Sequence, residues 1–197
     1  MKSTIKLAAL APALLLGGCL SFGGEAPDSL LTLTSTATVP AGAGAPMSQS
    51  NAIALVEFGS TTAIDVTRVP VQVTDTELAY LQDAVWVDRP ARLFGQLVAE
   101  TIRSRTGRMV VDGDDPGVGA IDRLHGTLRS FGYDARSRDV VVVFDAVRNG
   151  ASSNVTTRRF ESRVPVAAPE TAFVGPALNQ AANDVAGQIA DWVGQGA

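Results

Sequence analysis

The chain is poor in the residues that build most reactive sites. Its 197 residues include one cysteine and one histidine. A single cysteine excludes a disulfide framework and any cysteine-rich zinc or iron–sulfur site. A single histidine leaves little material for a metal centre or a histidine-based catalytic triad. The sequence therefore predicts no metal, no cofactor and no enzymatic activity.

Charge is also scarce. Only 18% of the residues are charged, against about 25% in an average globular domain. The 16 basic and 20 acidic residues leave a net charge of −4. A general nucleic-acid binder needs a clustered excess of lysine and arginine for its phosphate contacts, so this class is disfavoured.

The first nineteen residues have the pattern of an export signal. Lys2 and Lys6 precede an apolar run over residues 7–16, and two glycines stand directly before Cys19. A positive start, a short apolar run and small residues describe a signal peptide, and the run is shorter than the ~20 residues that span a bilayer. We interpret residues 1–18 as a lipoprotein signal peptide and Cys19 as the site of lipid attachment. The attached acyl chains are expected to include palmitate. The alternative is an ordinary signal peptide with a chance or buried cysteine.

Lipidation would tether the mature chain at its first residue, because two or three acyl chains anchor a protein stably. Leu20 follows the cysteine, and the lack of aspartate there is similar to bacterial sorting signals for the outer membrane. Residues 19–51 then form a tether and linker, with a short strand near residues 30–34. The Ala, Gly, Pro and Ser content of residues 35–51 predicts a mobile linker.

Residues 52–197 carry the periodicities of one folded domain. Helical spacing predicts one helix that Asp88 caps and Gly107 ends, and another from about residue 170 to 193. Short polar connectors predict hairpins between the last three strands. We expect an α+β fold in which two main helices pack on an antiparallel or mixed sheet. Predicted strands cover residues 52–58, 65–73 (Pro70 indicating an edge or bulge), 109–111, 121–133, 139–147 and 155–166, with a short strand or turn over 77–87.

No group of residues has the pattern of a catalytic site. Asp112, Asp114 and Asp115 lack the regular spacing of a calcium loop and favour a solvated acidic turn. His125 lies between Arg123 and Thr127 on the polar face of a predicted strand, and no nucleophile motif accompanies it. A surface histidine is the better interpretation.

Two sets of residues are candidate partner contacts. Four arginines would share one face of the sheet, either as a docking surface for a partner or anionic head groups, or as a solvent face balanced by Glu161. Tyr80 and Trp86 would either anchor a partner, since aromatic residues are enriched at interfaces, or pack in the core. The four arginines are Arg123, Arg129, Arg159 and Arg163.

The order of these features resembles the ABC-type transport auxiliary lipoprotein family. The lipobox cysteine is followed by a tether and a Leu-Leu-Thr-Leu segment, where the family has a Tyr-Tyr-x-Leu-like start. The linker, the sheet and the Ala-rich final helix complete the order. The segments that carry the resemblance are Cys19, residues 30–33, 52–58, 68–71 (Arg-Val-Pro-Val), 79–81 (Ala-Tyr-Leu) and 86–90 (Trp-Val-Asp-Arg-Pro).

This resemblance implies an α+β fold without catalytic residues. It implies a periplasmic accessory of MCE-type (mammalian cell entry) systems, which move phospholipids between the inner and outer membranes. The implied partners are the MCE-domain conduit protein with its ABC permease and ATPase, and a homo-oligomer is compatible with them. The alternatives are an outer-membrane lipoprotein that regulates cell-wall synthesis by binding a synthase, and, least favoured, a hydrolase with dispersed residues.

Replacing Cys19 with serine tests the lipid attachment. We expect Cys19→Ser to give an unlipidated or uncleaved product that no longer incorporates labelled palmitate, because the hydroxyl cannot replace the thiol. Metabolic labelling followed by electrophoresis measures this. Palmitate retained by the variant would show that the lipid is attached elsewhere.

Overall fold

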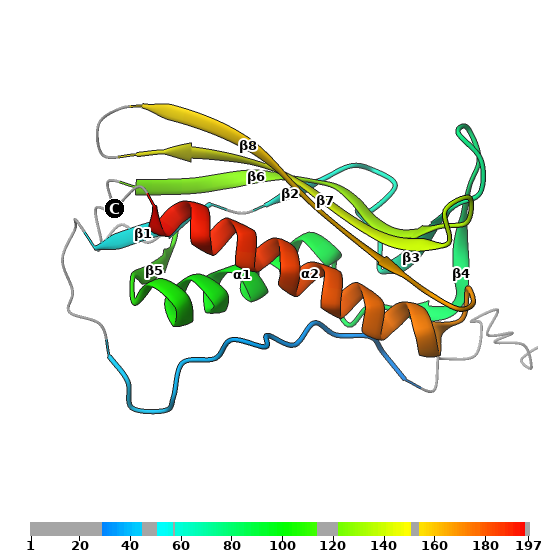
Figure 1. Ribbon diagram of the computed structural model, residues 1–197, viewed down its shortest axis with the longest axis horizontal. Coiled ribbons are helices and arrows are strands. Elements are labelled where there is room, and N and C mark those ends of the chain that lie inside the picture. The colour runs from blue at the N-terminus through cyan, green and yellow to red at the C-terminus, as the bar shows by residue number, and fades with distance from the viewer. Residues whose placement is uncertain (1–28, 45–50, 57, 114–121, 151–153, 196–197) are drawn as a thin grey trace, which may run out of the picture.

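The computed structural model describes residues 29–44, 51–56, 58–113, 122–150 and 154–195 (Figure 1). Within them the chain forms a single α+β domain with an eight-stranded mixed sheet, which is the predicted fold class. The strands are β1 (Ala52–Leu55), β2 (Gly59–Ser60), β3 (Arg68–Gln72), β4 (Leu78–Val85), β5 (Met109–Asp112), β6 (Asp122–Asp134), β7 (Asp139–Asn149) and β8 (Val155–Pro165), and the helices are α1 (Pro90–Thr106) and α2 (Thr171–Gly194).

β6 is the strand around which the sheet is built. One of its edges pairs in parallel with β1 near its start, with β2 in its middle and with β3 at its end. Its other edge pairs antiparallel with β7, which pairs antiparallel with β8. β5 extends the sheet beside β1, and β4 extends it beside β3. The hairpin order predicted for the last three strands is confirmed, and β7 is central, as its apolar sequence predicts.

The β3–β4 pair answers two questions that the sequence left open. The register shifts between Arg68 and Pro70, so the proline lies at a bulge, where a missing backbone N–H is tolerated. Residues 78–85 form a strand rather than a turn. This strand is irregular, because Asp83 takes a left-handed conformation with φ of 54°.

Both helices cover the same face of the sheet and lie side by side (Figure 1). The rings of Phe58, Phe94 and Phe144 meet between α1 and the sheet, with neighbouring centroids 4.6–6.1 Å apart. Burial of such surface stabilises the layers by about 25 cal/mol per Å² removed from water. The predicted stripe of α2 packs as expected, with Leu178, Ala182, Val185 and Ile189 fully buried and Trp192 against Phe160.

The ends of α1 agree in part with the sequence. Gly107 ends the helix at a φ of 64°, a left-handed conformation that glycine adopts without strain. Pro90 is in the first turn, as predicted, but the N-cap residue is Arg89 and no side chain caps the helix. The prediction that Asp88 is the cap is wrong, because its Oδ1 accepts a hydrogen bond from the Arg89 N–H (2.7 Å), outside the helix.

The N-terminal strap, residues 29–44, lies against the helices on the side away from the sheet (Figure 1). Asn179 and Asn183, one turn apart on α2, bond its backbone as a neighbouring strand would. The Thr34 N–H donates to Asn179 Oδ1 at 2.8 Å, and Asn183 Nδ2 donates to the Thr34 carbonyl at 2.9 Å. The expected strand near residues 30–34 is a single bridge from Leu31 to the residue after β4.

The described part of the predicted mobile linker is likewise held in place. Asn183 Oδ1 accepts from the Thr36 N–H, and Glu100 Oε1 of α1 accepts from the Val39 N–H, both at 2.8 Å. Over residues 35–39 the structure therefore differs from the prediction. Composition misled here because the bonding partners lie on helices more than sixty residues away in sequence.

A buried ion cluster joins the start of β6 to its neighbours. The side chains of Arg108, Asp122 and Arg148 are 6–9% exposed. Arg108 Nη1 donates to Asp122 Oδ2 at 2.6 Å, and Arg148 Nη2 donates to the same oxygen at 2.7 Å. Arg108 also reaches the Ala52 carbonyl of β1, and Arg148 reaches the Trp192 carbonyl of α2. Burial raises the pKa of Asp122, but hydrogen bonds and attraction from both guanidiniums outweigh it, so the pKa is lowered.

Asp122→Asn tests the importance of this cluster. We expect it to lower the free energy of unfolding by about 3–5 kcal/mol, because two buried guanidiniums lose their counter-charge. Denaturant unfolding measures the change. The control is Asp191→Asn, which removes an exposed ion pair with Arg105 and should cost less than about 1 kcal/mol. Equal losses in the two variants would contradict the role given to Asp122.

Candidate functional site

The outer face of the sheet, opposite the helices, collects the predicted arginines. In β6, Leu124 and Leu128 point to the core, which directs the alternate residues outward. In β8, buried Phe160 places Arg159 on the outer side, where it lies opposite Asp145 of β7. The register thus brings Arg123, Arg129, Arg159 and Arg163 to one face, as the alternation in the sequence predicts.

Asp145 is the centre of this face. The register of β6 shifts between Leu128 and Ser130, and Arg129 at this shift donates from Nε to Asp145 Oδ2 at 2.8 Å. Arg159 donates from Nε to Oδ1 at 2.6 Å and from Nη2 to Oδ2 at 2.8 Å. The hydrogen bonds from Arg159, followed by those from Arg129, hold the pKa of Asp145 at about 2 against the opposing effect of partial burial.

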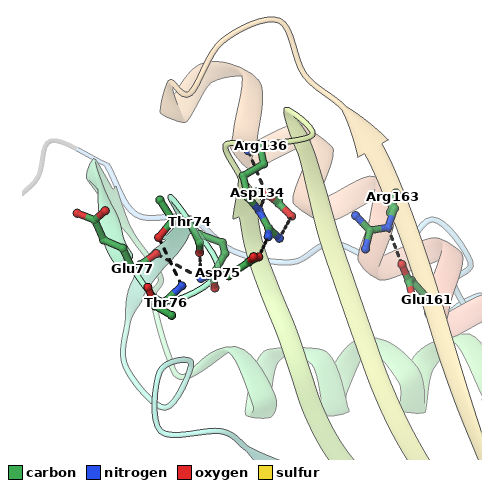
Figure 2. Close-up of polar contacts among 9 residues, drawn as sticks. Thr74, Asp75, Thr76, Glu77, Asp134, Arg136, Glu161 and Arg163 are labelled. Atoms are coloured by element: carbon green, nitrogen blue, oxygen red, sulfur yellow. Dashed lines mark hydrogen bonds and ion pairs between the residues drawn. The ribbon is translucent and has the colours of Figure 1, made fainter.

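A groove of about 340 Å³ continues from this face towards the β6–β7 turn. Arg136 of that turn donates to both carboxylate oxygens of Asp134, at 3.0 and 2.8 Å, and also to Asp75 of the β3–β4 loop (Figure 2). The Arg136 hydrogen bond lowers the pKa of Asp134 to about 2. On the far wall, Arg163 Nε donates to Glu161 Oε1 at 2.6 Å (Figure 2). The residues that line the groove include Ile64, Gln72, Arg129, Tyr133, Val141 and Arg163.

The two aromatic candidates have different environments. Trp86 is 2% exposed and packs on Phe131 with ring centroids 5.3 Å apart, so the core alternative holds and Trp86 is not available to a partner. Tyr80 is half-buried, and the Arg68 guanidinium lies 4.5 Å from its ring centroid. The sequence could not show which of the two is buried, because each directly follows an apolar residue, Ala79 or Val85.

The remaining candidates carry no constellation. His125 is half-buried on the outer face, in line with the surface histidine expected. Asp114 and Asp115, and the side chain of Asp112, lie outside the described residues. In the part of the chain that the structure describes, no three His, Cys, Asp or Glu side chains are grouped as metal ligands.

The sequence analysis missed two acidic residues, Asp145 at the centre of the outer face and Asp75 beside the groove. Asp145 is the single charged residue inside the otherwise apolar run over residues 140–147, and that isolation was a usable signal. Asp75 gave no signal, because its contact with Arg136 joins segments sixty-one residues apart.

Two crystal structures share the fold. Protein XCC0632 from Xanthomonas campestris is similar with a TM-score of 0.69 and 19% identity, over 84% of this chain and 94% of that one. An uncharacterized protein is similar with a TM-score of 0.61 and 11% identity, over 85% and 99% of the two chains. At these identities the similarity shows the fold alone. Among curated proteins, none matches the chain.

Residues 31–190 match the ABC-type transport auxiliary lipoprotein component family, and the chain belongs to it. The resemblance noted in the sequence is thereby confirmed. Membership makes the protein an auxiliary lipoprotein of an ABC-type transport system, a class that is lipid-anchored at the cell envelope. Within the described residues, no helix is both long and apolar enough to cross a bilayer.

Asp145→Asn tests the ion pairs of the outer face. Because the pKa of Asp145 is about 2, below the ~3.9 of an unfolded aspartate, its carboxylate stabilises the fold above about pH 4, and this contribution is lost as the pH falls towards 2. We expect the variant to unfold with less than about 1 kcal/mol lower free energy at pH 7, since both arginines are half-exposed. The difference should shrink steadily as the pH falls from about 4 towards 2.

Thermal unfolding of both proteins across pH 2–7 measures this difference. Asp139→Asn on the same strand is the control, because it removes the same charge without breaking the Asp145 pairs. If the wild type became more stable relative to Asp145→Asn as the pH falls, the stabilising role given to the Asp145 carboxylate would be wrong.

Proposed function

We propose that this chain is a non-catalytic accessory of an ABC/MCE-type phospholipid transport system between the inner and outer membranes. It acts by binding the MCE-domain protein that forms the periplasmic conduit. The observation that carries the proposal is the family match over residues 31–190. A permease and an ATPase at the inner membrane complete such a system.

The anchoring forms part of the same proposal. Residues 1–18 are removed as a signal peptide, Cys19 carries the lipid, and residues 52–197 form the transport auxiliary domain. The anchor lies in the outer membrane and the domain faces the periplasm. In this arrangement the N-terminal strap, which bonds Asn179 and Glu100, joins the tether to the domain.

The outer face of the sheet is the proposed docking surface. It carries four arginines, Arg123, Arg129, Arg159 and Arg163, and the last three of them pair with only two acids, Asp145 and Glu161. This imbalance favours an acidic partner surface, since complementary charge steers association and sets orientation. Tyr80, half-buried on β4, is a further candidate contact.

Affinity purification of the lipidated protein from cross-linked envelopes tests the function. We expect mass spectrometry to identify an MCE-domain protein with its permease and ATPase. Recovery of a cell-wall synthase without them would favour the alternative role in regulating cell-wall synthesis and reject the transport proposal.

The docking surface is tested by charge reversal in the same purification. The double variant Arg159→Glu/Arg163→Glu should lower recovery of the MCE-domain protein at least about tenfold, because like-charge contacts across an interface cost several kcal/mol and 1.4 kcal/mol is tenfold. The matched control is the double variant Arg89→Glu/Arg92→Glu at the start of α1, whose arginine side chains are 63% and 62% exposed and also ion-paired. Equal recovery with the outer-face variant and the control would reject this face while leaving the function intact.

A further inference from the structure

Three exposed apolar side chains lie at the end of the molecule where the N-terminal strap begins. Leu30 is 52% exposed, Val87 is 54% exposed and Phe173 is 45% exposed. They come from the strap, from the chain just after β4 and from the first turn of α2, and these three segments meet at one end of the domain (Figure 1). We call these three residues the apolar tip.

Contacts between the three segments make the tip a fixed part of the fold. The Val87 N–H donates to the Leu31 carbonyl at 2.9 Å, and Thr171 Oγ1 donates to the Gln82 carbonyl at 3.1 Å. A Cβ atom at Gly175 would lie only 2.9 Å from Leu31 Cδ2, so the strap sits directly on the start of α2. The three segments of the tip are therefore packed against one another, while their apolar side chains remain exposed.

The tether reaches the domain at this same tip. Residues 20–29, ten in number, separate Cys19 from Leu30. Ten residues span at most about 35 Å, even when fully extended. A connection of this length gives an effective concentration in the millimolar range. A contact between the tip and the anchoring surface therefore needs only a millimolar dissociation constant to be well populated.

We propose that the apolar tip rests on the lipid surface to which Cys19 is anchored. This inference depends on the lipid attachment in the proposed function and adds an orientation to it. Exposed leucine, valine and phenylalanine side chains leave water when they enter the interface between head groups and acyl chains. The far end of α2 then points away from the membrane, and the outer face of the sheet remains open to a partner.

The two tryptophans provide a test without an added label. Trp86 lies directly before Val87 in the sequence, whereas Trp192 lies near the far end of α2. Trp192 follows Gly175 by seventeen positions, which correspond to about 26 Å of helix. Bromine atoms on lipid acyl chains quench tryptophan at short range, so they should reach Trp86 and not Trp192.

The experiment uses the chain beginning at Cys19, coupled through that thiol to a maleimide phospholipid. The vesicles contain phosphatidylethanolamine and phosphatidylglycerol with ordinary or brominated acyl chains. In the Trp192→Phe background, we expect Trp86 to lose fluorescence in the brominated vesicles. Adding Leu30→Ser, Val87→Ser and Phe173→Ser should abolish this loss. These side chains are exposed, so the fold should persist, and circular dichroism checks it.

The results separate this inference from the proposed function. Quenching of Trp86 that is absent, or unchanged by the three serines, would overturn the inference. So would equal quenching of Trp192, measured in the protein carrying Trp86→Phe. The maleimide coupling supplies a tether whatever the cell attaches to Cys19, so a failure of natural lipidation appears separately, in the palmitate labelling of Cys19→Ser. Cross-linking of an MCE-domain protein to an unquenched tip would identify the tip as a protein interface instead.

Discussion

Two buried guanidiniums share one carboxylate at the start of β6, and much of the architecture depends on that contact. Asp122 faces Arg108 and Arg148, and through them it is linked to the carbonyls of Ala52 in β1 and Trp192 in α2. The cluster therefore fixes the point where β6 meets its first parallel neighbour and where the last helix ends. A buried charge cluster is a costly way to hold a fold, since each ion must leave water, but it permits few alternative arrangements.

Beyond that start, β6 pairs with most of the other strands of the sheet. Its 13 residues pair with three successive parallel strands on one edge and with the β7–β8 hairpin on the other. Both helices cover one face, so the other face is free for polar residues. Asp145 and Glu161 hold three arginines of the outer face, Arg129, Arg159 and Arg163, in defined positions. A pre-ordered cationic surface loses less side-chain entropy on binding than a mobile one.

The N-terminal strap connects this domain to its proposed anchor. Asn179, Asn183 and Glu100 supply the hydrogen bonds that a sheet edge would otherwise supply, so an extended segment is held against two helices. The strap therefore begins about ten residues after Cys19 in the sequence, at one end of the domain. In our proposals, one end of the molecule contacts lipid and the outer face of the sheet meets the conduit protein, which is an arrangement that suits an accessory between two membranes.

The sequence by itself determined the class of the fold, the order of its main elements and the face that carries the arginines. These depend on local periodicity and on short turns such as the one at Gly107, which are legible in one segment at a time. It left open whether Trp86 packs in the core or contacts a partner. It assigned the cap of α1 to Asp88, and it did not indicate that residues 35–39 bond to the helices. Only the tertiary structure decided these, and it also brought Asp75 to Arg136 and Asp122 to Arg108. The physical reason is that the contacts of Trp86, of residues 35–39, of Asp75 and of Asp122 each join residues that are distant along the chain, so no local pattern encodes them. The cap of α1 is the exception, because Asp88 there bonds the adjacent Arg89 N–H.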